Sequence, residues 1–177
     1  SRGLGDVYKR QVDKKRIKVP FPVMGVTKSE ILVRISGPSG VYVQDYIPLN
    51  GKSEWIERHL IADIDGDGRL EIVCVDNING CVIYFKCDGD PRETSSWSHG
   101  YISEGGLPGA YDVAVGDFDG DGDLDIAGSG WRIGNQFAWF ENRNGVWVRH
   151  IIEEDLPETR TIRTADFDGD GNLDLLG

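Results

Sequence analysis

Three nine-residue segments of the chain carry acidic side chains at a spacing that suits a hard cation. Each has carboxylates at positions 1, 3, 5 and 9, glycine at positions 4 and 6, and leucine at position 8. Alternating carboxylates let a short backbone curl around one centre, and the glycines supply the positive φ values that such a curl needs. The segments are residues 63–71 (DIDGDGRLE), 117–125 (DFDGDGDLD) and 166–174 (DFDGDGNLD), named loops 1, 2 and 3 below.

The ligand chemistry of these loops predicts calcium. Converging carboxylates repel one another unless a cation lies between them, and oxygen ligands without His or Cys favour calcium over zinc or copper. An acidic, glycine-rich run can also be a solvated turn, but three copies of one pattern disfavour that interpretation. We predict about three Ca²⁺ sites, in which position 7 contributes its backbone carbonyl. The predicted ligands are Asp63, Asp65, Asp67, Arg69 and Glu71 in loop 1, Asp117, Asp119, Asp121, Asp123 and Asp125 in loop 2, and Asp166, Asp168, Asp170, Asn172 and Asp174 in loop 3.

The residues after each loop exclude an EF-hand. That motif needs a bidentate Glu at position 12 and flanking helices, whereas position 12 is Cys74, Gly128 or Gly177 here. Short apolar runs follow the loops, and such runs are typical of strands.

The spacing of the loops predicts a repeating β architecture. The loops start 54 and 49 residues apart. Each interval holds a strand leaving the loop, an aromatic strand (82–85 and 137–140), a strand with Trp and His (97–102 and 147–152), and a strand entering the next loop. A period near 50 with four short strands is typical of propeller blades. We therefore predict an all-β fold, a partial β-propeller of about three four-stranded blades with calcium loops between first and second strands.

The N-terminal third follows a different pattern. Residues 1–11 resemble the translation of a DNA-sequencing adapter, so we expect them to be an artefact and exclude them from the fold. Residues 12–54 are expected to be a blade remnant without a calcium loop, in which Pro20 and Pro22 break any regular element and residues 31–35 and 41–46 form a hairpin. We expect the last blade to be truncated at residue 177.

Residues 117–130 resemble the FG-GAP/VCBS repeat family, which includes the calcium-binding blades of integrin α subunits and many bacterial surface proteins. The segments 139–142 (WFEN) and 147–151 (WVRHI) are similar to its bacterial branch. The resemblance covers roughly residues 55–177 and implies calcium-binding propeller blades there. Two features depart from the family. The N-terminal hairpin has no calcium loop, and Gly128-Ser129-Gly130 replaces the Gly-Ala-Pro sequence that usually ends the repeat.

The charge balance limits the class of partner. The formal net charge is −11, and 13 of the 30 acidic residues lie in the three loops. Three bound Ca²⁺ would bring the net charge to −5, so most of the acidity belongs to metal sites and argues against nucleic-acid binding. The sequence contains no run of about 18 apolar residues, which a membrane-spanning helix would need.

Other residues that could do chemistry have simpler interpretations. Paired carboxylates can hydrolyse glycosides, but three identical copies favour metal sites, so we expect no enzyme activity. The histidines and strand aromatics are expected to pack or form hydrogen bonds between blades rather than bind metal or sugar; these are His59, His99, His150, Tyr84, Phe85, Trp139 and Phe140.

The cysteines do not indicate a compartment. Cys81 and Cys87 lie in one predicted strand and cannot pair, whereas Cys74 could approach Cys81 across a hairpin. The simpler interpretation is that all three are small buried or half-buried side chains.

A binding surface is expected on the connections at the face opposite the calcium loops. These are residues 77–80, 104–109, 131–132 and 155–160, where Trp131 beside Arg132 suits carbohydrate or carboxylate recognition. We predict a secreted, cell-surface or periplasmic calcium-binding propeller module that serves as a structural or ligand-binding scaffold in adhesion or in carbohydrate or protein recognition. The alternative is the non-catalytic portion of a calcium-dependent propeller enzyme such as a polysaccharide lyase.

Overall fold

The structure, a computed structural model, describes residues 16–23, 26–35, 41–47, 56–91 and 93–177, and its side chains from Arg58 onward except at positions 92 and 94. In this part of the chain the secondary structure is strand, apart from one 3₁₀ turn, η2 (Thr94–Ser96). No helix there has the length and hydrophobicity to cross a membrane.

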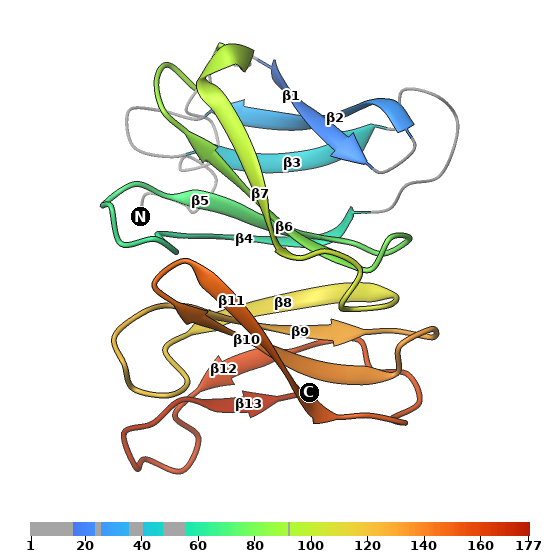
Figure 1. Cartoon of the computed structure of the whole chain (residues 1–177), viewed down its shortest axis with the longest axis vertical. Coiled ribbons are helices and arrows are strands. Elements are labelled where there is room, and N and C mark those ends of the chain that lie inside the picture. Colours follow the sequence, from blue (N-terminus) through green and yellow to red (C-terminus); the bar gives the residue numbers. More distant parts are fainter. Residues whose placement is uncertain (1–15, 24–25, 36–40, 48–55, 92) are drawn as a thin grey trace, which may run out of the picture.

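Two antiparallel four-stranded sheets form the centre of the molecule, and each follows chain order (Figure 1). The first comprises β4 (Ile56–Ala62), β5 (Glu71–Asp76), β6 (Cys81–Cys87) and β7 (Trp97–Ser103). The second comprises β8 (Ala110–Gly116), β9 (Asp125–Gly130), β10 (Gln136–Arg143) and β11 (Val146–Glu153). A third sheet has two strands, β12 (Arg163–Ala165) and β13 (Asp174–Leu176).

The first strands of successive sheets are neighbours, since β4 contacts β8 and β8 contacts β12. Apolar side chains from facing sheets fill the space between them, because alternate residues of each strand point to one face. The larger core includes Val73 from the first sheet, Ile64 from loop 1, and Ile126 and Phe140 from the second sheet. This open array of blades, each packed on the next, confirms the predicted all-β partial propeller.

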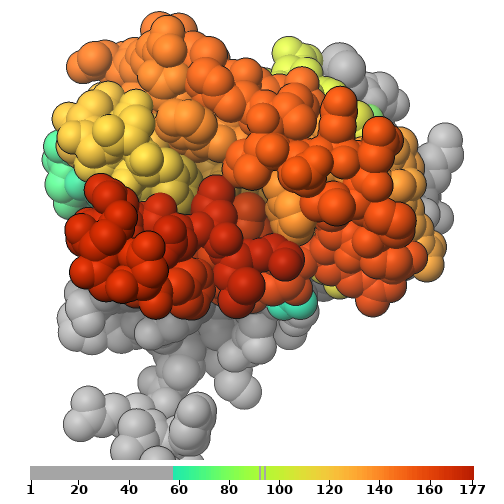
Figure 2. Space-filling view, turned by 90° about the horizontal axis from the view of Figure 1, so that it is seen from below, coloured from blue at the N-terminus to red at the C-terminus, as the bar shows by residue number. Residues whose placement is uncertain are grey.

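A second, smaller core joins the second sheet to the third. Ala114, Ala127 and Ile162 are buried in it, and Phe118 and Phe137 pack against them. Figure 2 shows the C-terminal residues, in dark red, lying directly against residues of the second sheet, in yellow and orange. The third sheet therefore packs on the second through an apolar core, as the second packs on the first.

The N-terminal sheet has three strands in the order β1 (Arg16–Val23), β2 (Val26–Ile35), β3 (Val41–Ile47). The predicted hairpin is confirmed, but the prediction that Pro20 and Pro22 break any regular element was wrong. Among the strands that the structure describes, β1 pairs only with β2. An edge strand needs only alternate N–H groups for its ladder, so it tolerates proline. Its register shifts between Phe21 and Val23, at Pro22. The expectation for residues 1–11 lies outside the described residues.

The three cysteines are free thiols, as the simpler interpretation predicts. Cys74 and Cys81 are buried and Cys87 is half-buried. In the β5–β6 ladder Cys74 lies opposite Ile83 and Cys81 opposite Asp76, so the hairpin does not bring the two thiols face to face.

Candidate metal centre

The three acidic loops join β4 to β5, β8 to β9 and β12 to β13, and Figure 1 shows them on one side of the stacked sheets. Three backbone-to-carboxylate hydrogen bonds recur in all of them. The position-6 N–H donates to the position-1 carboxylate at 2.9, 3.0 and 3.0 Å in loops 1, 2 and 3. The position-5 N–H donates to the position-3 carboxylate at 3.3, 3.2 and 3.0 Å, and the position-7 N–H to the position-5 carboxylate at 2.9, 2.8 and 2.8 Å.

The glycines at positions 4 and 6 have the left-handed conformation that the pattern predicts. Their φ values run from 70° at Gly66 to 96° at Gly122. A Cβ atom at any of the six would meet no heavy atom within 4 Å. Glycine is therefore needed for its backbone conformation and not for space, since other residues are strained at positive φ.

Each loop brings together the carboxylates of positions 1, 3 and 9, with one oxygen from each lying within 4.8 Å of the others. These triads are Asp63, Asp65 and Glu71; Asp117, Asp119 and Asp125; and Asp166, Asp168 and Asp174. The position-5 carboxylates, Asp67, Asp121 and Asp170, lie outside the triads. The position-7 carbonyl ligands of Arg69, Asp123 and Asn172 stay a prediction.

The position-9 carboxylate anchors each loop to the sheet. One of its oxygens accepts the position-2 N–H, at 3.0 Å from Ile64 to Glu71, 3.1 Å from Phe118 to Asp125 and 2.9 Å from Phe167 to Asp174. Glu71 and Asp125 are fully buried, and this burial raises the pKa of both carboxyl groups. An opposite charge close to them would offset that cost.

Loop 1 contains two acidic oxygens that are shielded from solvent and lack a hydrogen-bond partner, Asp63 Oδ1 and Glu71 Oε1. Buried polar atoms are nearly always paired, so such an atom calls for an explanation. Both residues belong to the loop 1 triad. The unpaired oxygens and the all-oxygen donor set fit a hard divalent cation.

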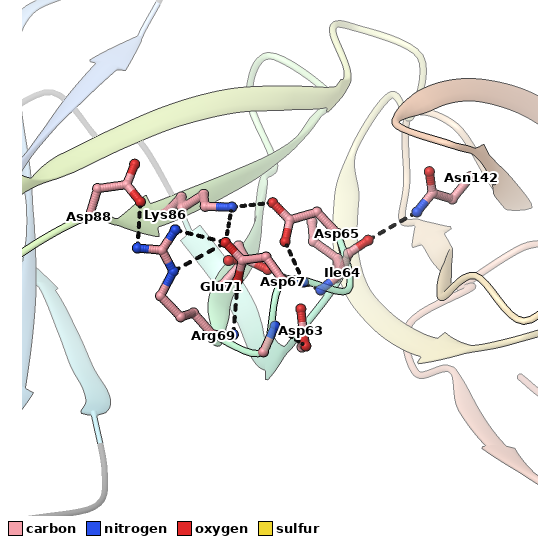
Figure 3. A network of polar contacts seen from close by, with 10 residues as sticks. Asp63, Ile64, Asp65, Asp67, Arg69, Glu71, Lys86, Asp88 and Asn142 are labelled. Atoms are coloured by element: carbon pink, nitrogen blue, oxygen red, sulfur yellow. Dashed lines mark hydrogen bonds and ion pairs between the residues drawn. The ribbon is translucent and has the colours of Figure 1, made fainter.

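Two basic side chains bind carboxylates of loop 1, one of them the triad member Asp65 (Figure 3). Lys86 Nζ contacts Asp65 Oδ2 and lies 2.7 Å from Asp67 Oδ2. The Arg69 guanidinium binds Asp67 at 2.8 Å and Asp88 at 2.8 Å. Hydrogen bonds from Arg69 and then Lys86 hold the pKa of Asp67 well below its usual range. Loop 1 is thus partly neutralised by the chain itself.

Loop 2 has a different electrostatic environment. Glu141 occupies the place of Lys86, because Phe85 lies opposite Ile72 in the first sheet and Phe140 opposite Ile126 in the second. Glu141 is in turn bound by Arg143, at 2.9 Å between Nη2 and Oε2, and by His150 Nε2 at 2.7 Å. Hydrogen bonds from these two side chains lower the pKa of Glu141.

Asn142, which the sequence indicated only as part of the segment 139–142 and not as a site residue, lies next to loops 1 and 2. Its Nδ2 donates to the Ile64 carbonyl of loop 1 at 3.0 Å and to the Leu124 carbonyl of loop 2 at 3.2 Å. The short β5–β6 turn fixes the register of these two strands, and this register could have predicted from the sequence that Lys86 lies beside loop 1. The contact between Asn142 and Ile64 needs the packing of one blade on the next, so no local pattern indicates it.

The histidines and strand aromatics take part in packing. His150 stacks on Trp139 with ring centroids 4.6 Å apart, and His99 lies 6.1 Å from Phe85. His99 pairs with Phe85 and His150 with Trp139, so the two histidines do not occupy equivalent positions. Phe85 and Phe140 are fully buried.

The four connections predicted to share the opposite face contact one another in chain order. The Leu107 N–H donates to the Gly80 carbonyl at 2.9 Å and the Trp131 N–H to the Gly109 carbonyl at 2.8 Å. Trp131 also donates its Nε1–H to Glu158 at 2.8 Å. The guanidinium carbons of Arg132 and Arg160 lie 3.9 and 4.4 Å from the centre of the Trp131 ring.

Open four-stranded sheets, packed on one another and each with the same acidic loop between its first and second strands, define blades of a β-propeller. Residues 63–128 match the family model of the FG-GAP-like repeat. The matched segment runs from loop 1 through β8 and loop 2 into β9, and over these residues the match confirms the resemblance to the FG-GAP-like repeat noted in the sequence. No curated protein and no solved structure matches the chain significantly.

Proposed function

We propose that the chain is a calcium-binding β-propeller module in which each acidic loop binds one Ca²⁺. The observation that carries the proposal is the loop 1 triad, where a fully buried Glu71 and its neighbour Asp63 each have an oxygen without a partner. Loops 2 and 3 have the same triad and share the backbone hydrogen bonds of loop 1, although the position-1 oxygen that is unpartnered in loop 1 accepts the position-4 N–H in loops 2 and 3. The side chains at positions 1, 3 and 9 would hold the ion.

The role of the ion would be to stabilise the turn between the first two strands of each blade. A glycine-rich loop with several carboxylates is costly to order, because its backbone loses much entropy and its charges repel. A cation that binds only the folded form stabilises it by roughly 2.7 kcal/mol per site at a hundredfold excess over Kd. The chain's own residues would orient the carboxylates through the N–H groups of positions 5 and 6.

Calorimetric titration of the whole chain with calcium tests this proposal. Asp119→Ala removes a triad carboxylate and should abolish binding at loop 2. Asp123→Ala is the matched control: it lies in the same loop but outside the triad, and its predicted contribution is a backbone carbonyl. Equal losses from both variants would contradict the ligand assignment. A chain that takes up no calcium, and melts at the same temperature with and without chelator, would refute the function.

We also propose an extracellular, cell-surface or periplasmic location and a role as a scaffold. Weak calcium sites fill where calcium is in the millimolar range, which is outside the cytoplasm. Repetition of one metal loop in successive blades supports a structural role. The alternative is that these blades are the non-catalytic part of a calcium-dependent propeller enzyme, which activity of the full protein on polysaccharides would reveal.

For an external ligand we propose the face opposite the calcium loops. Arg132 and Arg160 are exposed there beside Trp131, so the cluster suits acidic groups of a carbohydrate or protein. Glycan-array profiles of the wild type, Trp131→Ala and Arg132→Ala should differ. Identical profiles would remove this surface from consideration.

A further inference from the structure

Asn142 is a buried residue of β10 that forms hydrogen bonds with two different acidic loops. It is 3% exposed, and its two amide hydrogens are directed at Ile64 O, 3.0 Å away in loop 1, and Leu124 O, 3.2 Å away in loop 2. A side-chain amide has two donor hydrogens, so both are used. Its Oδ1 accepts the Gly145 N–H at 2.7 Å, which completes the pairing of the amide.

The backbone of Asn142 holds the position-9 carboxylate of loop 2. Its N–H donates to Asp125 Oδ1 at 2.7 Å, and Phe118 donates to the other oxygen of the same group. On the other side, Ile64 donates its N–H to Glu71 Oε2 at 3.0 Å. Glu71 and Asp125, the position-9 carboxylates of two loops, are therefore joined through only two residues, Ile64 and Asn142.

The residues of this connection are buried and closely packed. Glu71 and Asp125 are 0% exposed, Ile64 is 4% exposed, and Ile64 packs in the same core as Phe140, two residues before Asn142. In Figure 3, Asn142 approaches Ile64 from the side of the loop that faces the second sheet, away from Lys86 and Arg69. A change in the order of one loop is therefore transmitted to the other through groups with little freedom to absorb it.

We propose that Asn142 couples the cation sites of loops 1 and 2, so that occupancy of either site raises the affinity of the other. The coupling rests on the proposed function. An ion at loop 2 fixes Asp125, and with it Asn142 and the Ile64 carbonyl, so part of the cost of ordering loop 1 is already met. Linkage requires the effect to be reciprocal.

Loop 3 provides a matched control. Its position-9 carboxylate, Asp174, accepts the Phe167 N–H at 2.9 Å, as in the other loops. Phe167 is 57% exposed, whereas Ile64 is buried. Within the residues that the structure describes, no side-chain amide links loop 3 to loop 2 as Asn142 links loops 1 and 2.

Calorimetric titration of the full chain with calcium, in variants that inactivate one loop at a time, tests the coupling. Asp119→Ala, which inactivates loop 2, should weaken calcium binding at loop 1 by about fivefold or more. Asp168→Ala, which inactivates loop 3, should leave loop 1 unchanged. With Asn142→Ala in place, Asp119→Ala should have no further effect on loop 1.

The outcomes separate this proposal from the proposed function. Equal effects of Asp119→Ala and Asp168→Ala on loop 1, a gain in loop 1 affinity on losing loop 2, or coupling that survives Asn142→Ala would each overturn it. The comparison of the two aspartate variants needs no change at Asn142, so it can still overturn the coupling of loops 1 and 2 if Asn142→Ala does not fold. A wild-type chain that binds no calcium would instead refute the proposed function.

Discussion

Replacing Glu71 by Gln should change the stability of the protein in opposite directions with and without calcium. Glutamine keeps the shape of the side chain and still accepts the Ile64 N–H, which lies 3.0 Å from Glu71 Oε2. The substitution removes a fully buried charge. It also replaces the unpartnered Oε1 of Glu71 by an amide group, which can donate a hydrogen bond to the unpartnered Oδ1 of Asp63. An unsatisfied buried polar group costs about 1–3 kcal/mol. In chelator, Glu71→Gln should therefore raise the free energy of unfolding by about 1–2 kcal/mol.

With calcium in excess the same substitution removes a ligand of loop 1. The stabilisation lost is up to roughly 2.7 kcal/mol at a hundredfold excess over Kd. Urea unfolding at pH 7, once with chelator and once with millimolar calcium, measures both values. A loss of stability of equal size in the two conditions would mean that Glu71 serves only as a hydrogen-bond acceptor, and the metal assignment of loop 1 would fail.

The matched control is Asp174→Asn in loop 3. Asp174 also occupies position 9 and accepts the Phe167 N–H, but it is only half-buried. It should lose stability in calcium and gain none in chelator.

The pH dependence in chelator provides an independent measurement. Burial raises the pKa of Glu71 above its ordinary value of 4.5, so the folded state holds the proton more tightly than the unfolded state. The stability contributed by this group is full below pH 4.5 and is lost as the pH rises through the raised pKa. Glu71→Gln should remove that part of the slope.

Three further predictions concern single side chains. Lys86→Gln removes an ammonium group from the loop 1 carboxylates, and calorimetry should show calcium binding there tightened by roughly threefold to tenfold. Gly122→Ala puts a Cβ on a residue with φ of 96° and should destabilise the protein by about 1–2 kcal/mol in urea unfolding, and an unchanged midpoint would refute the strained turn. Alkylation followed by mass spectrometry should modify half-buried Cys87 before buried Cys74, whose pKa burial raises, and faster reaction at Cys74 would contradict this packing.

The sequence contains enough information to predict the loops and the strands around them. Carboxylate and glycine spacing predicts the curl, and the positive φ of Gly66 and Gly68 follows from it. The order of strands in each sheet follows from short turns, which permit only neighbouring strands to pair. These features depend on residues close together in the chain.

The features that sequence reasoning missed depend on contacts between distant residues. Ile64 and Asn142 are 78 positions apart, and their hydrogen bond exists only because β4 packs on β8. The same holds for proline in β1, which is acceptable because that strand lies at a sheet edge. An edge position follows from the arrangement of the whole sheet, and the prolines themselves do not indicate it.

The three loops share one backbone geometry, yet their charges differ enough to predict different affinities. The carbonyl predicted as the position-7 ligand leaves the side chain there free to vary, and it is Arg69 in loop 1 but Asp123 in loop 2. Lys86 adds a second positive charge to loop 1, whereas its counterpart beside loop 2 is Glu141. Arg143 offsets the charge of Glu141, but loop 2 has five carboxylates of its own and loop 1 has four, so loop 2 presents a stronger negative field to a cation than loop 1 does. Lys86 and Arg69 lower the affinity of loop 1 for a cation. If Asn142 couples the two sites, an ion that binds first at loop 2 would raise the affinity of loop 1 and offset this effect.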